Sequence, residues 1–184
     1  MSDQQQNLYF IALIPHLELR EQMKAFKEEM KEQFDAKHAL KSPAHITMQM
    51  PFRGSDEFEL HLINSLREFA SNQNAFKVQL SGFDCFSPRV IFVKVADHEP
   101  IVSVHSDFKK IFKEKIELKE TVLTQKLHPH MTIATRDLRE KAFKKAWSLF
   151  NEREFEASFV SKSLFLLKHN GTFWDIYREF HFNS

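Results

Sequence analysis

The sequence has a single cysteine, Cys85, and only three glycines among its 184 residues. One cysteine excludes an intramolecular disulfide and every zinc site that needs two or more thiolates, and it fits a reducing compartment. Three scattered glycines exclude the glycine-rich phosphate loops of nucleoside-triphosphate and dinucleotide folds, because both loops need glycines within one turn. The chain is therefore neither a disulfide scaffold nor a member of those two nucleotide-binding classes.

An excess of charge and a long apolar run are also missing. The 26 Lys and Arg nearly balance the 25 Asp and Glu, for a net charge of +1, so no global basic field draws the chain to duplex DNA. The apolar run near the N-terminus covers only residues 8–15, whereas a membrane-spanning helix needs about 20. No cationic segment or cleavage site marks a signal peptide. We expect a soluble, cytoplasmic monomer that binds neither duplex DNA nor a membrane.

Hydrophobic residues make up 42% of the chain and include 20 Phe, which is enough for one folded domain over residues 1–184. Apolar residues alternate in some segments, as in strands, and recur every three or four residues in others, as in amphipathic helices. These patterns predict strands at 9–14, 45–52, 76–83, 89–95, 130–135, 155–167 and 173–182. They predict helices at 19–34, 58–69 with a cap at Ser55 or Asp56, 101–116 and 138–150. Residues 169–172 read as a hairpin turn.

The order strand, helix, strand, helix, strand occurs twice, which indicates an internal duplication with a period of about 85 residues. The predicted fold class is α+β: a bilobal duplication with two mainly antiparallel sheets, flanked by helices, around a pseudo-twofold cleft. The lobes would span approximately 9–85 and 86–182, with room for an exchange of terminal strands.

Two four-residue motifs occupy equivalent positions in the two halves. They read His45-Ile46-Thr47-Met48 and His130-Met131-Thr132-Ile133, that is His, apolar, Thr, apolar. With ten His and six Thr in the chain, chance supplies about 0.06 such motifs. In a strand, residues two apart point to the same face, so each motif offers one imidazole and one hydroxyl side by side. If the halves face each other, two imidazoles and two hydroxyls converge on one cleft.

This set of groups suits cleavage of a phosphodiester. One group must take a proton from the attacking water and another must give a proton to the leaving oxygen, and histidine performs either role near neutral pH. The Thr hydroxyls can donate hydrogen bonds to the phosphate oxygens, where negative charge is held in the transition state. The motifs therefore indicate acid/base chemistry on a phosphate ester without a cofactor or a metal.

The paired motifs on duplicated strand and helix units resemble those of the 2H phosphoesterase superfamily, which includes 2'-5' RNA ligase-like proteins and cyclic phosphodiesterases. The resemblance covers about residues 9–182. It implies a hydrolase that opens 2',3'-cyclic phosphates, or related cyclic or 2',5'-linked phosphodiesters, of RNA ends or nucleotides. It also implies that His45 and His130 are the catalytic pair, with His130 as base and His45 as acid, and that Thr47 and Thr132 bind the phosphate.

Further candidates near the motifs are not fixed by spacing. The aromatic candidates for stacking on a base are Phe52, Phe86 and Trp174. The cationic candidates for phosphate contacts are Lys41, Arg53, Lys126 and Arg136.

Several alternatives remain open. The same cleft could serve a non-catalytic module that binds nucleotides or RNA ends, or a reversible 2'-5' RNA ligase. His128 and His130 could hold a metal, although no third ligand lies at a diagnostic spacing. The Lys and Arg residues at 139, 141, 144 and 145 are either a solvated helix face or an RNA contact. Most Phe residues are expected in the core.

Overall fold

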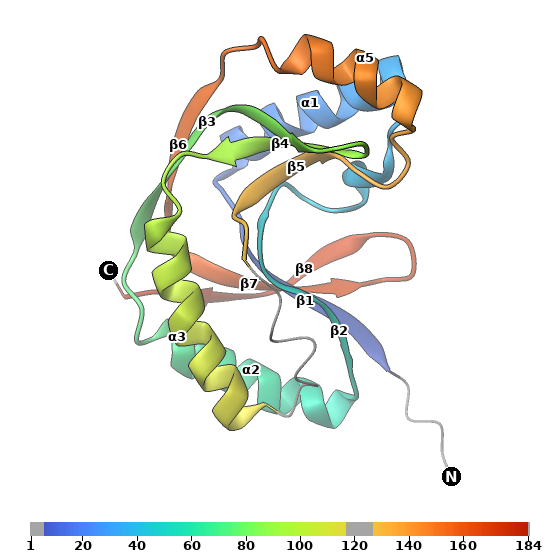
Figure 1. Cartoon of the computed structure of the whole chain (residues 1–184). Coiled ribbons are helices and arrows are strands. Elements are labelled where there is room, and N and C mark those ends of the chain that lie inside the picture. The colour runs from blue at the N-terminus through green and yellow to red at the C-terminus, as the bar shows by residue number, and fades with distance from the viewer. Residues whose placement is uncertain (1–5, 117–126, 184) are drawn as a thin grey trace.

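The computed structural model describes residues 6–116 and 127–183, which form two four-stranded antiparallel sheets with helices on their outer faces (Figure 1). The first sheet has the strand order β2-β1-β7-β8, and the second has the order β5-β4-β3-β6. The strands of the first sheet are β1 (Asn7–Leu13), β2 (Ile46–Gly54), β7 (Ser163–His169) and β8 (Trp174–His181). Those of the second are β3 (Phe76–Phe86), β4 (Val90–Val95), β5 (His130–Ala134) and β6 (Glu156–Ser161).

The described helices are α1 (Leu17–Phe34), α2 (Asp56–Ala70), α3 (Glu99–Lys115), α5 (Glu140–Phe150) and the short 3-10 helix η1 (His38–Lys41). In Figure 1, α1 and α5 lie over the second sheet, and α2 and α3 lie together over the first. Helix α1 follows a strand of the first sheet but covers the second, and α3 follows a strand of the second sheet but packs against α2 and, through Phe112, against Phe52 of β2. None of the described helices is long and apolar enough to cross a membrane.

The central strand β1 has two apolar faces, and each serves a different purpose. Tyr9, Ile11 and Leu13 belong to the main core, where the Tyr9 hydroxyl donates a hydrogen bond to Glu59 of α2. On the opposite face, Phe10 and Ala12 join a smaller buried cluster that also contains Ile14 and Leu167. This second cluster lies on the face of the sheet that carries the first histidine motif, where Phe10 contacts the ring of His45.

Local sequence signals explain where several elements begin and end. The Ser55 hydroxyl accepts a hydrogen bond from the Phe58 amide at 3.2 Å, so the predicted cap of the second helix is confirmed. The turn predicted at 169–172 is confirmed as the β7–β8 hairpin, where the Asn170 side chain accepts from the amides of Thr172 and Phe173. Gly171 takes a positive φ of 101° there, which glycine adopts without strain.

The predicted strand over 155–167 is wrong in one respect, because it is two strands in different sheets. β6 ends at Ser161 and pairs with β3, whereas β7 begins at Ser163 and pairs with β1. The apolar and polar side chains keep alternating across Lys162, and no turn residue stands there. The sequence pattern therefore could not show that the chain changes sheet at this point. The other predicted elements agree with the observed ones within a few residues.

The two predicted lobes, 9–85 and 86–182, are each divided between the sheets. Strand β3 from the first range pairs with β4 in the second sheet, and β7 and β8 from the second range extend the first sheet. The fold is therefore bilobal and pseudo-twofold, with strands of each half exchanged through the centre.

Candidate active site

Each histidine motif lies on an edge strand with its polar residues on the inner face of a sheet. The interleaved Ile46, Met48, Met131 and Ile133 are fully or almost fully buried. His45, Thr47, His130 and Thr132 keep partial exposure. The alternation predicted for both motifs is confirmed, and the burial of the apolar residues fixes which face each His and Thr occupies.

The two imidazoles are held in the same way. The Nδ1 of His45 lies 2.7 Å from the carbonyl oxygen of Pro43, and the Nδ1 of His130 lies 2.5 Å from the carbonyl oxygen of His128. A carbonyl can only accept, so each Nδ1 carries a proton and donates it. In the neutral ring Nε2 is then an unprotonated acceptor, which is the form a general base needs.

Aromatic rings support both imidazoles, again in a repeated arrangement. The centroid of the Phe10 ring lies 4.8 Å from that of His45, and the Phe92 centroid lies 4.8 Å from that of His130. Each Phe contacts a further aromatic ring at 4.6 Å, which is Trp174 for Phe10 and Phe86 for Phe92. These contacts give each imidazole one apolar wall and limit its rotation.

Burial and neighbouring cations lower the pKa of both histidines. Burial is the main cause at His45, and repulsion from the Lys27 ammonium and from His130 adds to it, so its pKa is about 4 despite the opposing hydrogen bond to Pro43. Burial also lowers the pKa of His130, with smaller contributions from His128 and His98 against the bond to the His128 carbonyl. Strands β2 and β5, which carry the two motifs, contact each other across the two sheets, so the motifs face each other.

Lys27 of α1 is a candidate functional residue that the sequence analysis missed. Only 3% of it is exposed, and its ammonium donates to the carbonyl of Ser42 at 2.9 Å. Burial lowers the pKa of Lys27 to about 8. The sequence carries one indication that Lys27 is buried. It lies between Met23 and Met30 on the apolar face of the helix.

A second missed cation is Lys94 of β4. It is the direct partner of His130 in the β4–β5 register, so both side chains leave the same face of the sheet.

The structure brings some of the weaker candidates close to the histidines. Lys41 and Trp174 line a cavity whose wall also includes Pro43 and Lys27. Phe86 is 41% exposed and lies 5.2 Å from His130 between ring centroids. These positions suit a phosphate contact and two stacking surfaces.

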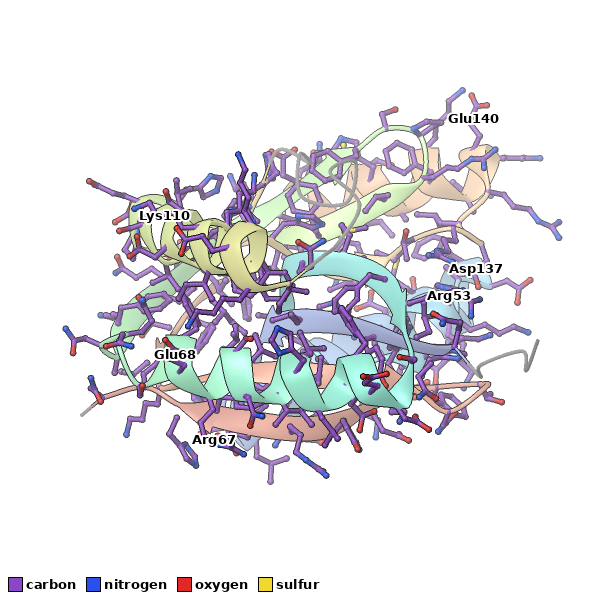
Figure 2. All side chains as sticks on the ribbon, turned by 90° about the horizontal axis from the view of Figure 1, so that it is seen from below. Arg53, Arg67, Glu68, Lys110, Asp137 and Glu140 are labelled. Atoms are coloured by element: carbon purple, nitrogen blue, oxygen red, sulfur yellow. The ribbon has the colours of Figure 1, made fainter. Side chains whose placement is uncertain are left out.

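Three other candidates lie elsewhere. The prediction of base stacking by Phe52 is wrong, because its ring is 5% exposed and packs in the core against Tyr9 and Phe58. Arg53 pairs with Leu8 at the other end of β2 (Figure 2), about 26 Å of strand from His45. Arg136 lies beyond the far end of β5 with a φ of 58°, facing a cavity with Lys37 and Arg89. Lys126 lies outside the described residues.

The rings of His98, His128 and His130 approach one another. Their centroids are 5.4 Å apart for His98 and His128, and 5.9 Å apart for His128 and His130. Within residues 6–116 and 127–183, however, no three His, Cys, Asp or Glu side chains are grouped so that they could hold a metal ion.

Comparison with known proteins identifies the family. The profile of the 2'-5' RNA ligase superfamily matches residues 15–172, so the chain belongs to this superfamily of phosphoesterases and ligases. It is 25% identical over 175 residues to a protein of Oceanobacillus iheyensis named "Putative phosphoesterase OB1230", covering 94% of this chain and 96% of that protein. A Bacillus pumilus protein named "Putative phosphoesterase" is 25% identical over 130 residues, 70% of each chain.

Solved structures show the same fold at low sequence identity. Escherichia coli LigT, in a crystal structure with 3'-AMP, has a TM-score of 0.72 and 16% identity, over 98% of this chain and all of LigT. The protein TT0787 of Thermus thermophilus has a TM-score of 0.65 and 16% identity, over 95% of this chain and 97% of that one.

Proposed function

We propose that this protein is a metal-independent phosphodiesterase that opens 2',3'-cyclic phosphates, or related cyclic or 2',5'-linked phosphodiesters, of nucleotides or RNA ends. The observation that carries the proposal is the repeated pair of imidazoles. Both are fixed by a bond from Nδ1 to a carbonyl two residues earlier, both rest on a Phe ring, and the neutral tautomer of both leaves Nε2 unprotonated. Two histidines are enough for the two proton transfers of the reaction.

The proposed roles follow from what each group can donate or accept. His130 accepts a proton from the attacking water at Nε2, and His45 gives a proton from Nε2 to the leaving oxygen. Thr47 and Thr132 donate hydrogen bonds to the non-bridging oxygens of the phosphate. With a pKa of about 4, His45 is neutral in the free protein at pH 7. Its role as acid therefore requires the bound phosphate anion to raise its pKa.

The ligands of the structural relatives support a nucleotide substrate. LigT has been crystallised with 3'-AMP, with ATP and with NADP+. 3'-AMP is one product expected from opening a 2',3'-cyclic nucleotide, so it is the appropriate product analogue for this chain.

Turnover of 2',3'-cyclic AMP in excess chelator tests the proposal. We expect His45→Ala and His130→Ala each to lose about 10²- to 10⁴-fold in kcat, and the double variant to be no worse, because the two residues act as a unit. His61→Ala, an exposed histidine on α2, is the matched control and should keep wild-type rates. Thermal melts verify that each variant is folded. Wild-type protein with no turnover of cyclic nucleotides or RNA ends in chelator would refute the proposal.

Ligation is the second candidate, because the matched superfamily takes its name from it. It is the reverse reaction in the same site, and it predicts a joined product from RNA ends bearing a 2',3'-cyclic phosphate and a 5'-hydroxyl. A purely binding module predicts no reaction in either direction and unchanged ligand affinity in His130→Ala.

A further inference from the structure

A cavity of about 260 Å³ lies next to His45, between α1 and the β7–β8 hairpin. Its lining includes Pro43 and Ala44, which directly precede His45, and Lys27, whose charge lowers the pKa of His45. The lining also includes Leu17, Arg20 and Lys24 of α1 and the hairpin residues Phe173 and Trp174. We call it the α1–hairpin cavity.

The side chains lining the α1–hairpin cavity are strongly biased toward positive charge. Four cations, Arg20, Lys24, Lys27 and Lys41, face one carboxylate, Glu21. Within the described part of the chain, neither Arg20 nor Lys24 takes part in an ion pair. The Nε atom of Arg20 is buried without a hydrogen-bond partner among those residues. Because the Arg20 side chain lines the cavity, its guanidinium can donate charge-assisted hydrogen bonds to an anionic oxygen bound there.

The opposite wall offers aromatic surface. Phe173 is 49% exposed, and Trp174 packs edge-on against Phe10, which in turn supports His45. Cations on one side and aromatic rings on the other are the combination that binds single-stranded nucleic acid, through its phosphates and its bases.

The spacing of the cations along α1 separates two anion positions. Arg20, Lys24 and Lys27 lie four and three residues apart, so they share one face of the helix. About 10 Å of helix axis separates Arg20 from Lys27, at 1.5 Å per residue. A phosphate that reacts between the histidines is near Lys27, so Arg20 and Lys24 are left for a second anion farther along the same molecule.

We propose that the α1–hairpin cavity is a second-phosphate subsite, which binds a phosphate attached to the 5' oxygen of the nucleoside whose 2',3' end reacts. This inference rests on the proposed function and narrows its substrate class to molecules with two phosphate positions. The second phosphate is either the phosphodiester of an RNA chain or a pyrophosphate. Beyond Arg20 a further cavity of about 330 Å³, lined in part by Lys162, Phe165 and Ile176, leaves room for more chain and favours RNA.

Equilibrium binding by calorimetry tests the subsite without any turnover. The three ligands share an adenosine 3'-phosphate: 3'-AMP alone, the dinucleotide ApAp with a 5' phosphodiester, and adenosine 3'-phosphate 5'-diphosphate with a 5' pyrophosphate. We expect at least one of the two larger ligands to bind wild type about tenfold more tightly than 3'-AMP, which is the value of one charge-assisted hydrogen bond. The ligand with the larger gain identifies the source of the second phosphate.

The double variant Arg20→Gln/Lys24→Gln should lose this gain and bind 3'-AMP as wild type does. Lys31→Gln is the matched control, since Lys31 is an exposed lysine on the same helix outside the cavity, and it should keep the gain. The subsite is refuted if neither larger ligand binds wild type more tightly than 3'-AMP, or if the gain survives in the double variant. Failure of the proposed function would appear separately, as absence of chelator-resistant turnover with the binding preference intact.

Discussion

Replacing Lys27 by Met should raise both the pKa of His45 and the stability of the fold at neutral pH. Met is unbranched and apolar, so it can occupy the buried channel of the Lys27 stem without carrying a charge. At an effective dielectric constant of about 20, unit charges roughly 5–10 Å apart repel by about 2–3 kcal/mol. Removing that repulsion should raise the pKa of His45 from about 4 by about one to two units.

The stability effect follows from the pKa of Lys27 itself. Burial lowers this pKa from 10.5 to about 8, so between those values the unfolded chain binds more protons than the folded one. Stability therefore rises with pH across that window, and below pH 8 the folded state carries the whole cost of the buried charge. A difference of about 2.5 pKa units corresponds to about 3 kcal/mol. At pH 7, Lys27→Met should raise the free energy of unfolding by much of this amount. The gain is reduced by the loss of the hydrogen bond to the Ser42 carbonyl.

Two measurements test this reasoning. Titration of the histidine ring protons by NMR should show a higher pKa of His45 in Lys27→Met than in wild type. Urea unfolding should show that the variant is more stable than wild type at pH 7, and that its stability does not rise above pH 8 as that of wild type does. Lys31→Met, an exposed lysine on the same helix, should change neither. An unchanged His45 pKa would refute the electrostatic coupling, and a variant less stable than wild type at pH 7 would refute the cost assigned to the buried ammonium.

The remaining predictions concern Glu59, which binds side chains of the first sheet from α2, and two arginines that lie away from the histidines. Glu59 accepts from Lys168, Tyr177 and Tyr9, and although burial raises its pKa, these bonds hold the pKa below its usual value. The stabilisation that the ionised Glu59 carboxylate provides is therefore complete above pH 4.5 and is lost as the pH falls through the lowered pKa. In urea unfolding, Glu59→Gln should lower the free energy of unfolding by about 2–3 kcal/mol at pH 7 and by less at pH 3. An equal loss of stability at the two pH values would contradict this prediction. Arg53→Ala and Arg136→Ala should each change kcat/KM for a cyclic nucleotide by less than about twofold, because both side chains lie at strand ends away from the histidines; a tenfold loss in steady-state assays would place them in the site.

Much of the site could be predicted because its signals are local. A period of two puts His45 and Thr47 on one face and Ile46 on the other, whatever the rest of the chain does. The same applies to His130 and Thr132, and the repetition of the motif after about 85 residues indicates the duplication. The cap at Ser55 is likewise read from a few neighbouring residues.

Errors and omissions arose where the answer depends on distant parts of the chain. Phe52 is the exception, because local alternation already excluded it. It lies an even number of residues from Ile46 and Met48, on the face opposite His45, and the structure places all three apolar side chains in one buried cluster. Lys27 looked like one of many helix lysines until α1, crossing from the first sheet to the second, was placed beside His45. Nothing near Lys162 in sequence showed that β6 and β7 join different sheets.

Most of the helices and strands, the faces of the two motif strands and the residue types of the proposed two-histidine site could be read from the chain alone, because side-chain periodicity and motif chemistry act over a few residues. The exchange of strands, the burial of Lys27 and the cavity lined by Lys27 and Pro43 became visible only in the folded chain. Those features depend on which surfaces pack together, and packing is settled by the summed burial and pairing of segments far apart in the chain.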